Sequence, residues 1–195
     1  MENEYLIVGL GNPGREYERT RHNAVFMVVE RLAALWKAGW STEKKFSARV
    51  AKVERDGKRL WLCQPQTYMN LSGESVGALL SFRKIEVTRL LVVVDDADLP
   101  LGEIRLRPSG SSGGHHGLES VEQHVGGREY ARQRIGIGRQ DQAVRQIAGH
   151  VLAQFGPAER DLLEKILKKA CEQAECWFGF GVAKAMNQFN GAVKV

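Results

Sequence analysis

The stretch L-L-V-V-V-D-D-A-D-L-P, residues 90–100, decides the fold that we predict. Its first five residues are all apolar and branched, as in a central strand that is buried on both faces of a parallel sheet. Polar residues and a proline follow directly, so the strand ends there in a loop. Ligands of open α/β sheets bind at the carboxyl ends of the strands, which makes this loop a first candidate for a binding site.

Strands and helices alternate on both sides of this run. Strand patterns occur at Tyr5–Leu10, Phe46–Val53, Leu60–Gln64, Glu103–Arg107 and Arg132–Ile137, of which the second and third flank a turn at Asp56-Gly57. Helical spacing of apolar residues occurs at Arg21–Trp36, Ser72–Phe82 and Ala158–Phe178. We therefore predict a three-layer α/β/α fold in which helices flank a twisted sheet, and the hairpin makes that sheet mixed.

Length and composition limit the number of domains and the class of protein. With 195 residues, 43% of them hydrophobic, the chain can bury one core, so we expect a single domain over residues 1–195. No apolar run approaches the roughly 18 residues that a membrane helix needs, and the start M-E-N-E-Y lacks the features of a signal peptide. These observations predict a cytoplasmic protein that binds no membrane, and a monomer, since no long exposed apolar stretch is evident.

Charge and cysteine content bear on the partners. The net charge of +5 favours a polyanionic partner through long-range attraction and ion release. The three cysteines are an odd number and none has C-x-x-C spacing, so neither a disulfide framework nor a zinc knuckle is indicated. We predict no metal.

A glycine motif, Gly9-x-Gly11-x-x-Gly14, follows the first predicted strand and has the spelling of a dinucleotide-binding turn. That turn needs a helix that begins at the glycines and an acidic residue about 20 positions later at the end of a strand. Here a polar interval follows, Pro13 stiffens the turn, and the acidic candidate Glu30 falls within a predicted helix. We therefore predict no dinucleotide cofactor.

A second motif, Gly110-x-Ser112-x-Gly114, has the spelling of the nucleophile elbow of serine hydrolases, and Asp141 and His150 follow in the required order. The elbow places its serine at the apex of a sharp strand-to-helix turn, whereas Pro108-Ser109-Gly110 separates Ser112 from the preceding strand. A flexible glycine-serine loop explains the same spelling. A serine esterase stays an alternative, which inhibition by serine-directed reagents would reveal.

A histidine and an aspartate form the most informative pair. His22 lies at the start of a predicted helix, where the helix dipole favours a neutral, basic imidazole that suits a general base. Asp95 ends the most buried strand, and an aspartate bonded to the other ring nitrogen would fix the tautomer and stabilise the imidazolium. The polar segments 9–14, 66–70 and 95–100 each follow a predicted strand, so parallel strands would bring them to one edge. For His22 alone, a structural hydrogen bond at a helix end is the alternative.

Five blocks extend along nearly the whole chain: G-L-G-N-P-G at 9–14, T-R-H-N at 20–23, T-Y-M-N-x-S-G at 67–73, D-D-x-D-L-P-x-G at 95–102 and R-I-G-I-G at 134–138. In order and spacing they resemble the blocks of bacterial peptidyl-tRNA hydrolases. The resemblance implies hydrolysis of the ester that joins a peptidyl or N-blocked aminoacyl group to the 3′ end of tRNA. Water would be the nucleophile, without metal or other cofactor, and the partner would be peptidyl-tRNA, bound at its acceptor stem and 3′ end.

The resemblance also implies roles for individual residues. His22 would be the general base, and Asp95 would orient it. Binding of the peptidyl moiety and the walls of the cleft would fall to Asn12, Tyr17, Met69, Asn70 and His116. Basic segments 105–107 and 128–139 would contact tRNA phosphates without reading sequence, chiefly through Arg105, Arg107 and Arg134. For each single arginine, a solvated charged surface is the alternative.

Three positions depart from the family pattern. Val25 replaces a glycine and Ala97 a leucine, which we interpret as packing changes. His116 stands in G-G-H-H-G where the family has asparagine, so we expect reduced activity or an additional pH dependence. This change gives some weight to a non-catalytic RNA-binding protein on the same fold, like the plant organelle splicing factors that resemble these hydrolases. The presence of both catalytic candidates and both asparagines speaks against it.

Overall fold

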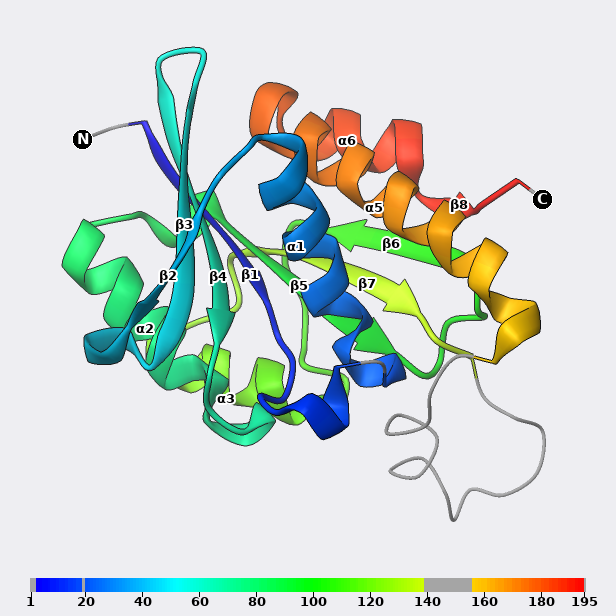
Figure 1. The fold of residues 1–195 in the computed structure, drawn as a ribbon. Coiled ribbons are helices and arrows are strands. Elements are labelled where there is room, and N and C mark those ends of the chain that lie inside the picture. Colours follow the sequence, from blue (N-terminus) through cyan, green and yellow to red (C-terminus); the bar gives the residue numbers. More distant parts are fainter. Residues whose placement is uncertain (1–2, 19, 139–155, 195) are drawn as a thin grey trace.

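The computed structural model describes residues 3–18, 20–138 and 156–194, without the side chain of His22, and it places one mixed sheet between two layers of helices (Figure 1). The order of strands across the sheet is β2-β3-β4-β1-β5-β7-β6-β8. Their bounds are Glu4–Gly9 (β1), Trp40–Glu43 (β2), Ala48–Arg55 (β3), Lys58–Pro65 (β4), Leu90–Asp96 (β5), Glu103–Arg107 (β6), Ala131–Gly136 (β7) and Gly191–Ala192 (β8). The α/β fold class with a mixed sheet is confirmed.

The four central strands run in one direction. β1 pairs in parallel with β4 and with β5, and β5 pairs in parallel with β7. The outer strands β2, β3, β6 and β8 are antiparallel to their neighbours. The polar segments after β1, β4 and β5 consequently leave the sheet at the same edge, as predicted from their positions.

Two hydrophobic cores fill the space between the sheet and its helices. One face is covered by α1 (Ala24–Leu35), α5 (Arg160–Phe180) and α6 (Val182–Phe189), and the other by α2 (Ser72–Arg83) and α3 (His116–Val125) (Figure 1). Side chains of β1 alternate between them: Ile7 belongs to the first core, and Leu6 and Val8 to the second. Both faces of the central strands are therefore buried, which explains the uninterrupted aliphatic run of β5.

Several elements were not predicted. The helix expected from Arg21 begins instead with a 3-10 turn, η2 (Arg21–Asn23), and α5 begins two residues late, after η6 (Pro157–Glu159). Strands β2 and β8 and helices α3 and α6 were missed altogether. Helix α3 buries Gly117 and Ser120 beside Leu118 and Val121, with Val125 partly buried, so its apolar stripe is short and gives only a weak signal in the sequence. In the described ranges, no helix is long and apolar enough to cross a membrane.

Glu4, the first residue of β1, has a largely buried carboxylate. It accepts hydrogen bonds from Arg59 at 3.0 Å, from Trp61 at 2.9 Å and from Arg83 at 2.9 and 3.1 Å. Burial acts to raise the pKa of Glu4, but the hydrogen bonds from Arg83 and Trp61 and the charges of Arg83 and Arg59 outweigh it, so the pKa lies below its ordinary value.

Glu4→Gln is expected to lower the free energy of unfolding at pH 7 by about 2 kcal/mol, because it weakens bonds to a charged acceptor. A lowered pKa stabilises the fold above the pKa of the unfolded chain, and this contribution disappears as the pH falls through the folded pKa. Urea unfolding should be measured at pH 7 and at about pH 3.5. The difference in the free energy of unfolding between Glu4→Gln and wild type should be smaller at the lower pH. An equal difference at both values would contradict the proposed charge effect.

Candidate active site

Asn12 joins two of the polar segments at the carboxyl edge of the sheet. Its backbone N–H donates to Asn23 Oδ1 at 2.8 Å, and Asn23 Nδ2 donates back to the Asn12 carbonyl at 2.7 Å. Its side-chain Oδ1 accepts from the Met69 N–H at 2.8 Å. The amide of Asn12 is thus fixed through its oxygen, which orients its Nδ2 group as a donor for a ligand.

The residues on either side of His22 hold turn η2 at the same edge. Arg21 is buried and donates to the Ile137 carbonyl at 3.2 Å and to both carboxylate oxygens of Glu159 at 2.7 Å. Asn23 is bonded to Asn12, and η2 contacts β5. The backbone of His22 is therefore fixed near the end of β5, while its side chain lies outside the described residues. Arg21 and Asn23 were not predicted as functional.

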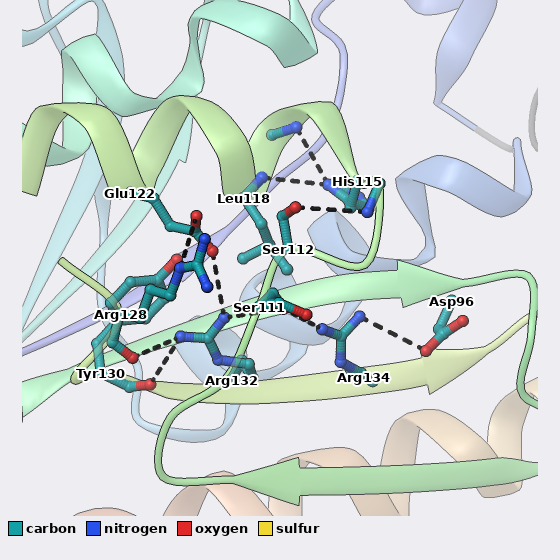
Figure 2. Close-up of polar contacts among 12 residues, drawn as sticks. Asp96, Ser111, Ser112, His115, Leu118, Glu122, Arg128, Tyr130, Arg132 and Arg134 are labelled. Carbon is teal, nitrogen blue, oxygen red and sulfur yellow. Dashed lines mark hydrogen bonds and ion pairs between the residues drawn. The ribbon is translucent and has the colours of Figure 1, made fainter.

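Asp95 is the last buried residue of β5, and it is only 4% exposed. Its Oδ1 lies 3.0 Å from Nε2 of His115. His115 is the N-cap of α3, and its Nδ1 accepts from the N–H groups of Gly117 at 3.1 Å and Leu118 at 3.3 Å (Figure 2). His115 was missed because α3 was not predicted, although the sequence does show its position after a glycine-rich loop.

The remaining predicted site residues lie along the same edge. Met69 is buried in η4 (Met69–Leu71), and Asn70 beside it is exposed. A Cβ added to Gly117 would lie 2.6 Å from Met69 Sδ, so η4 and the start of α3 are in close contact. Tyr17 is half-buried in η1 (Arg15–Tyr17). The structure thus brings Asn12 and Met69 into direct contact and links Met69 to Asp95 through Gly117 and His115.

His116 points away from that group. Its side chain is 77% exposed, and Nδ1 lies 3.2 Å from Oε2 of Glu119, one turn further along α3. The neighbouring histidine, His115, is the one that contacts Asp95. Of the two adjacent histidines, His115 therefore points toward Asp95, whereas His116 points toward solvent.

Four arginines share one face of the β6–β7 ladder. The register pairs Arg105 with Arg134 and Arg107 with Arg132, while the alternate residues, such as Ile104 and Ile135, belong to the core beneath α5. Arg105, Arg107 and Arg134 are exposed or half-buried. Arg132 is only 1% exposed, and its guanidinium lies 4.2 Å from the ring centre of Tyr130, so this member of the predicted basic segment 128–139 is not a surface residue.

The two motifs that have the spelling of a dinucleotide-binding turn and of a nucleophile elbow have local structural roles instead. Gly9 and Gly11 lie so close to η2 and α1 that a Cβ would come within 2.9 Å of the Val25 carbonyl and 2.7 Å of Asn23 Oδ1. Only the three-residue η1 follows them, so the helix that a dinucleotide turn requires does not begin there. Ser112 lies in the loop after β6, its Oγ accepting from Gly114 N–H at 3.4 Å, rather than at a strand-to-helix apex. Its suggested partners, Asp141 and His150, lie outside the described residues.

No group of three or more His, Cys, Asp or Glu residues in the described part of the chain is placed to hold a metal ion.

Comparisons with known proteins identify the family. The sequence profile of a family described as peptidyl-tRNA hydrolase matches residues 6–195. A peptidyl-tRNA hydrolase of Carboxydothermus hydrogenoformans is 50% identical over 187 residues, covering 95% of this chain and 98% of that protein. One from Synechococcus sp. (strain JA-2-3B'a(2-13)) is 47% identical over 185 residues, covering 95% and 82%. The crystal structure of peptidyl-tRNA hydrolase from Acinetobacter baumannii is 37% identical with a TM-score of 0.91, covering 99% of this chain and 97% of that one. The chain belongs to the peptidyl-tRNA hydrolase family.

Proposed function

We propose that this chain hydrolyses the ester bond of peptidyl-tRNA and releases free tRNA, using a water activated by His22 and Asp95. The activity follows from membership of the family over nearly the whole chain. The observation that best supports the mechanism is the buried Asp95 carboxylate at the end of β5, at the edge where η2 holds the backbone of His22. Asn12 and Met69 belong to the same edge.

The proposed reaction needs one proton relay. His22 takes a proton from water as the water oxygen attacks the ester carbonyl carbon, and Asp95 stabilises the imidazolium that forms. The carbonyl oxygen becomes an oxyanion, for which the Nδ2 groups of Asn12 and Asn70 are the candidate donors. When the tetrahedral intermediate collapses, the 3′ oxygen of tRNA leaves and takes the proton back from His22. Tyr17 and Met69 would form the walls beside the peptidyl group.

Release of tRNA should be measured from N-acetyl-aminoacyl-tRNA and from unblocked aminoacyl-tRNA, with EDTA present throughout. We expect cleavage of the blocked substrate only, and His22→Ala should lose nearly all activity. If the wild type binds tRNA but cleaves neither substrate, the alternative of a non-catalytic RNA-binding protein replaces this proposal.

Arg105, Arg107 and Arg134 are proposed to contact the phosphates of the acceptor stem, because they lie together on one face of β6 and β7. The double variant Arg105→Gln/Arg134→Gln is expected to weaken tRNA binding about tenfold at low salt and to reduce the slope of log K against log salt by about one to two. Binding should be measured over a salt series. Arg55→Gln, at the β3–β4 turn on the opposite edge, is the control. An unchanged affinity and slope in the double variant would exclude this footprint.

His116→Asn, which restores the family residue, is expected to keep or raise the activity. The His116 side chain is mostly exposed and contacts Glu119, so its replacement removes little packing. Initial rates at pH 6 to 8 should show whether an additional pH dependence disappears with the imidazole. A large loss of activity would show that His116 has acquired a role of its own.

We also propose that the protein is a cytoplasmic monomer formed by one domain over residues 1–195. Sedimentation of the purified protein tests its oligomeric state, and limited proteolysis tests the domain boundary.

A further inference from the structure

We propose that His115 is a positioning residue for the hydrolysis: its Nε2–H group holds the Asp95 carboxylate while its Nδ1 atom caps helix α3. This inference rests on the proposed function of Asp95. The resemblance implied no role for His115, although this residue stands in the G-G-H-H-G stretch, and the role follows from the two sets of contacts made by its ring nitrogens.

The hydrogen bonds determine the tautomer of His115. Two backbone donors, Gly117 N–H at 3.1 Å and Leu118 N–H at 3.3 Å, point at Nδ1 (Figure 2). A proton on Nδ1 would meet both donors, so Nδ1 must be an acceptor, and the proton of the neutral ring is on Nε2. That proton then lies between Nε2 and Asp95 Oδ1, which are 3.0 Å apart. The helix cap thereby fixes the ring in the tautomer that donates to Asp95.

The loop before His115 is held at two carbonyl groups. Gly110, Gly113 and Gly114 all have positive φ, and a Cβ at Gly110 or Gly114 would meet nothing within 4 Å, so packing alone does not fix this loop. Arg134 donates to the Ser111 carbonyl at 3.0 Å, and Arg132 lies 3.5 Å from the same oxygen (Figure 2). The N–H of His115 itself donates to the Ser112 carbonyl at 3.1 Å.

The ring of His115 is also confined where it faces Gly117. A Cβ added to Gly117 would lie 2.9 Å from His115 Cε1 and 2.6 Å from Met69 Sδ, so the ring packs near the start of α3 with little free space. The side chains of His115 and Asp95 are 11% and 4% exposed. Because both groups are largely shielded from water, the hydrogen bond from His115 to Asp95 is protected from competition by solvent, and it helps to fix the direction of the carboxylate.

Two substitutions of His115 test its two contacts one at a time, because each keeps one contact and removes the other. In His115→Asn, the side-chain Oδ1 takes the place of Nδ1 and can cap α3, but the side chain is too short to reach Asp95. In His115→Gln, Nε2 takes the place of the ring Nε2 and can donate to Asp95, but the cap is lost. His124→Asn, the same change nine residues further along α3, is the matched control.

Peptidyl-tRNA hydrolysis and thermal unfolding should be measured for all three variants. We expect His115→Asn to lower kcat about tenfold or more, as for other partners that orient a reacting group, with KM and Tm near wild type. His115→Gln should recover most of kcat but lower Tm, and His124→Asn should resemble wild type in both. A wild-type kcat in His115→Asn, or losses of kcat that follow Tm in both variants, would overturn the proposal.

A second measurement does not depend on activity. Nitrogen NMR of the wild-type ring should show an unprotonated Nδ1 and a protonated Nε2, and Asp95→Ala should let the Nε2 proton exchange faster with water. A protonated Nδ1 would overturn the assignment. If the wild type fails to release tRNA while this tautomer is observed, the proposed function fails and the His115–Asp95 contact stands.

Discussion

Asp95→Asn is expected to lower kcat for peptidyl-tRNA by about a thousandfold or more and to change KM by only a few-fold. Asparagine has the shape of aspartate, and its Oδ1 can still accept from His115 Nε2, so the fold should be kept. The negative charge that would stabilise the imidazolium of His22 is lost. The amide can also present an N–H group where the ring needs an acceptor, which favours the wrong tautomer for a general base.

The measurement is a single-turnover release of tRNA, with Tm recorded for the same preparation. Asp56→Asn, at the exposed β3–β4 turn, is the control for the same chemical change, and it should behave as wild type. A loss of less than tenfold in Asp95→Asn, at an unchanged Tm, would mean that the base works without this carboxylate. His22 would then need another partner.

The central part of the fold could be predicted because its signals are local. The five aliphatic residues that begin β5 are buried on both faces, and the turn at Asp56-Gly57 joins β3 to β4 in the expected hairpin. Strand direction is not local, and the meeting of the three polar segments depended on it. The parallel pairing of β4, β1 and β5 confirmed that step.

Contacts between distant residues could not be predicted. Asn23 and Asn12 exchange two hydrogen bonds across eleven positions, and His115 reaches Asp95 across twenty. Neither pair has a spacing that a sequence motif would display. Arg132 was wrongly expected at the surface, because a basic segment predicts solvated side chains. In the structure, Tyr130 and the backbone of the neighbouring loop surround the Arg132 side chain.

Gly73→Ala is expected to cause a large loss of stability, about 3 kcal/mol or more, because it separates α2 from α3. A Cβ at Gly73 would lie 2.0 Å from the Ser120 carbonyl oxygen and 2.4 Å from its carbon. These are backbone atoms of α3, so no change of rotamer can relieve the overlap. The Gly73 N–H also donates to Ser120 Oγ at 2.9 Å, and this bond would lengthen when the helices move apart.

Thermal unfolding should show a Tm lower by about 10 °C for Gly73→Ala. Gly179→Ala, in α5, is the control, because its Cβ would meet nothing within 4 Å and alanine favours the helix, so it should be neutral or stabilising. A Tm within two degrees of wild type in Gly73→Ala would contradict the close helix contact. The same displacement would move the start of α3, with His115, away from Asp95, so the folded fraction of Gly73→Ala should also have a lower kcat. Packing of two helices through one glycine thus bears directly on the geometry of the proposed active site.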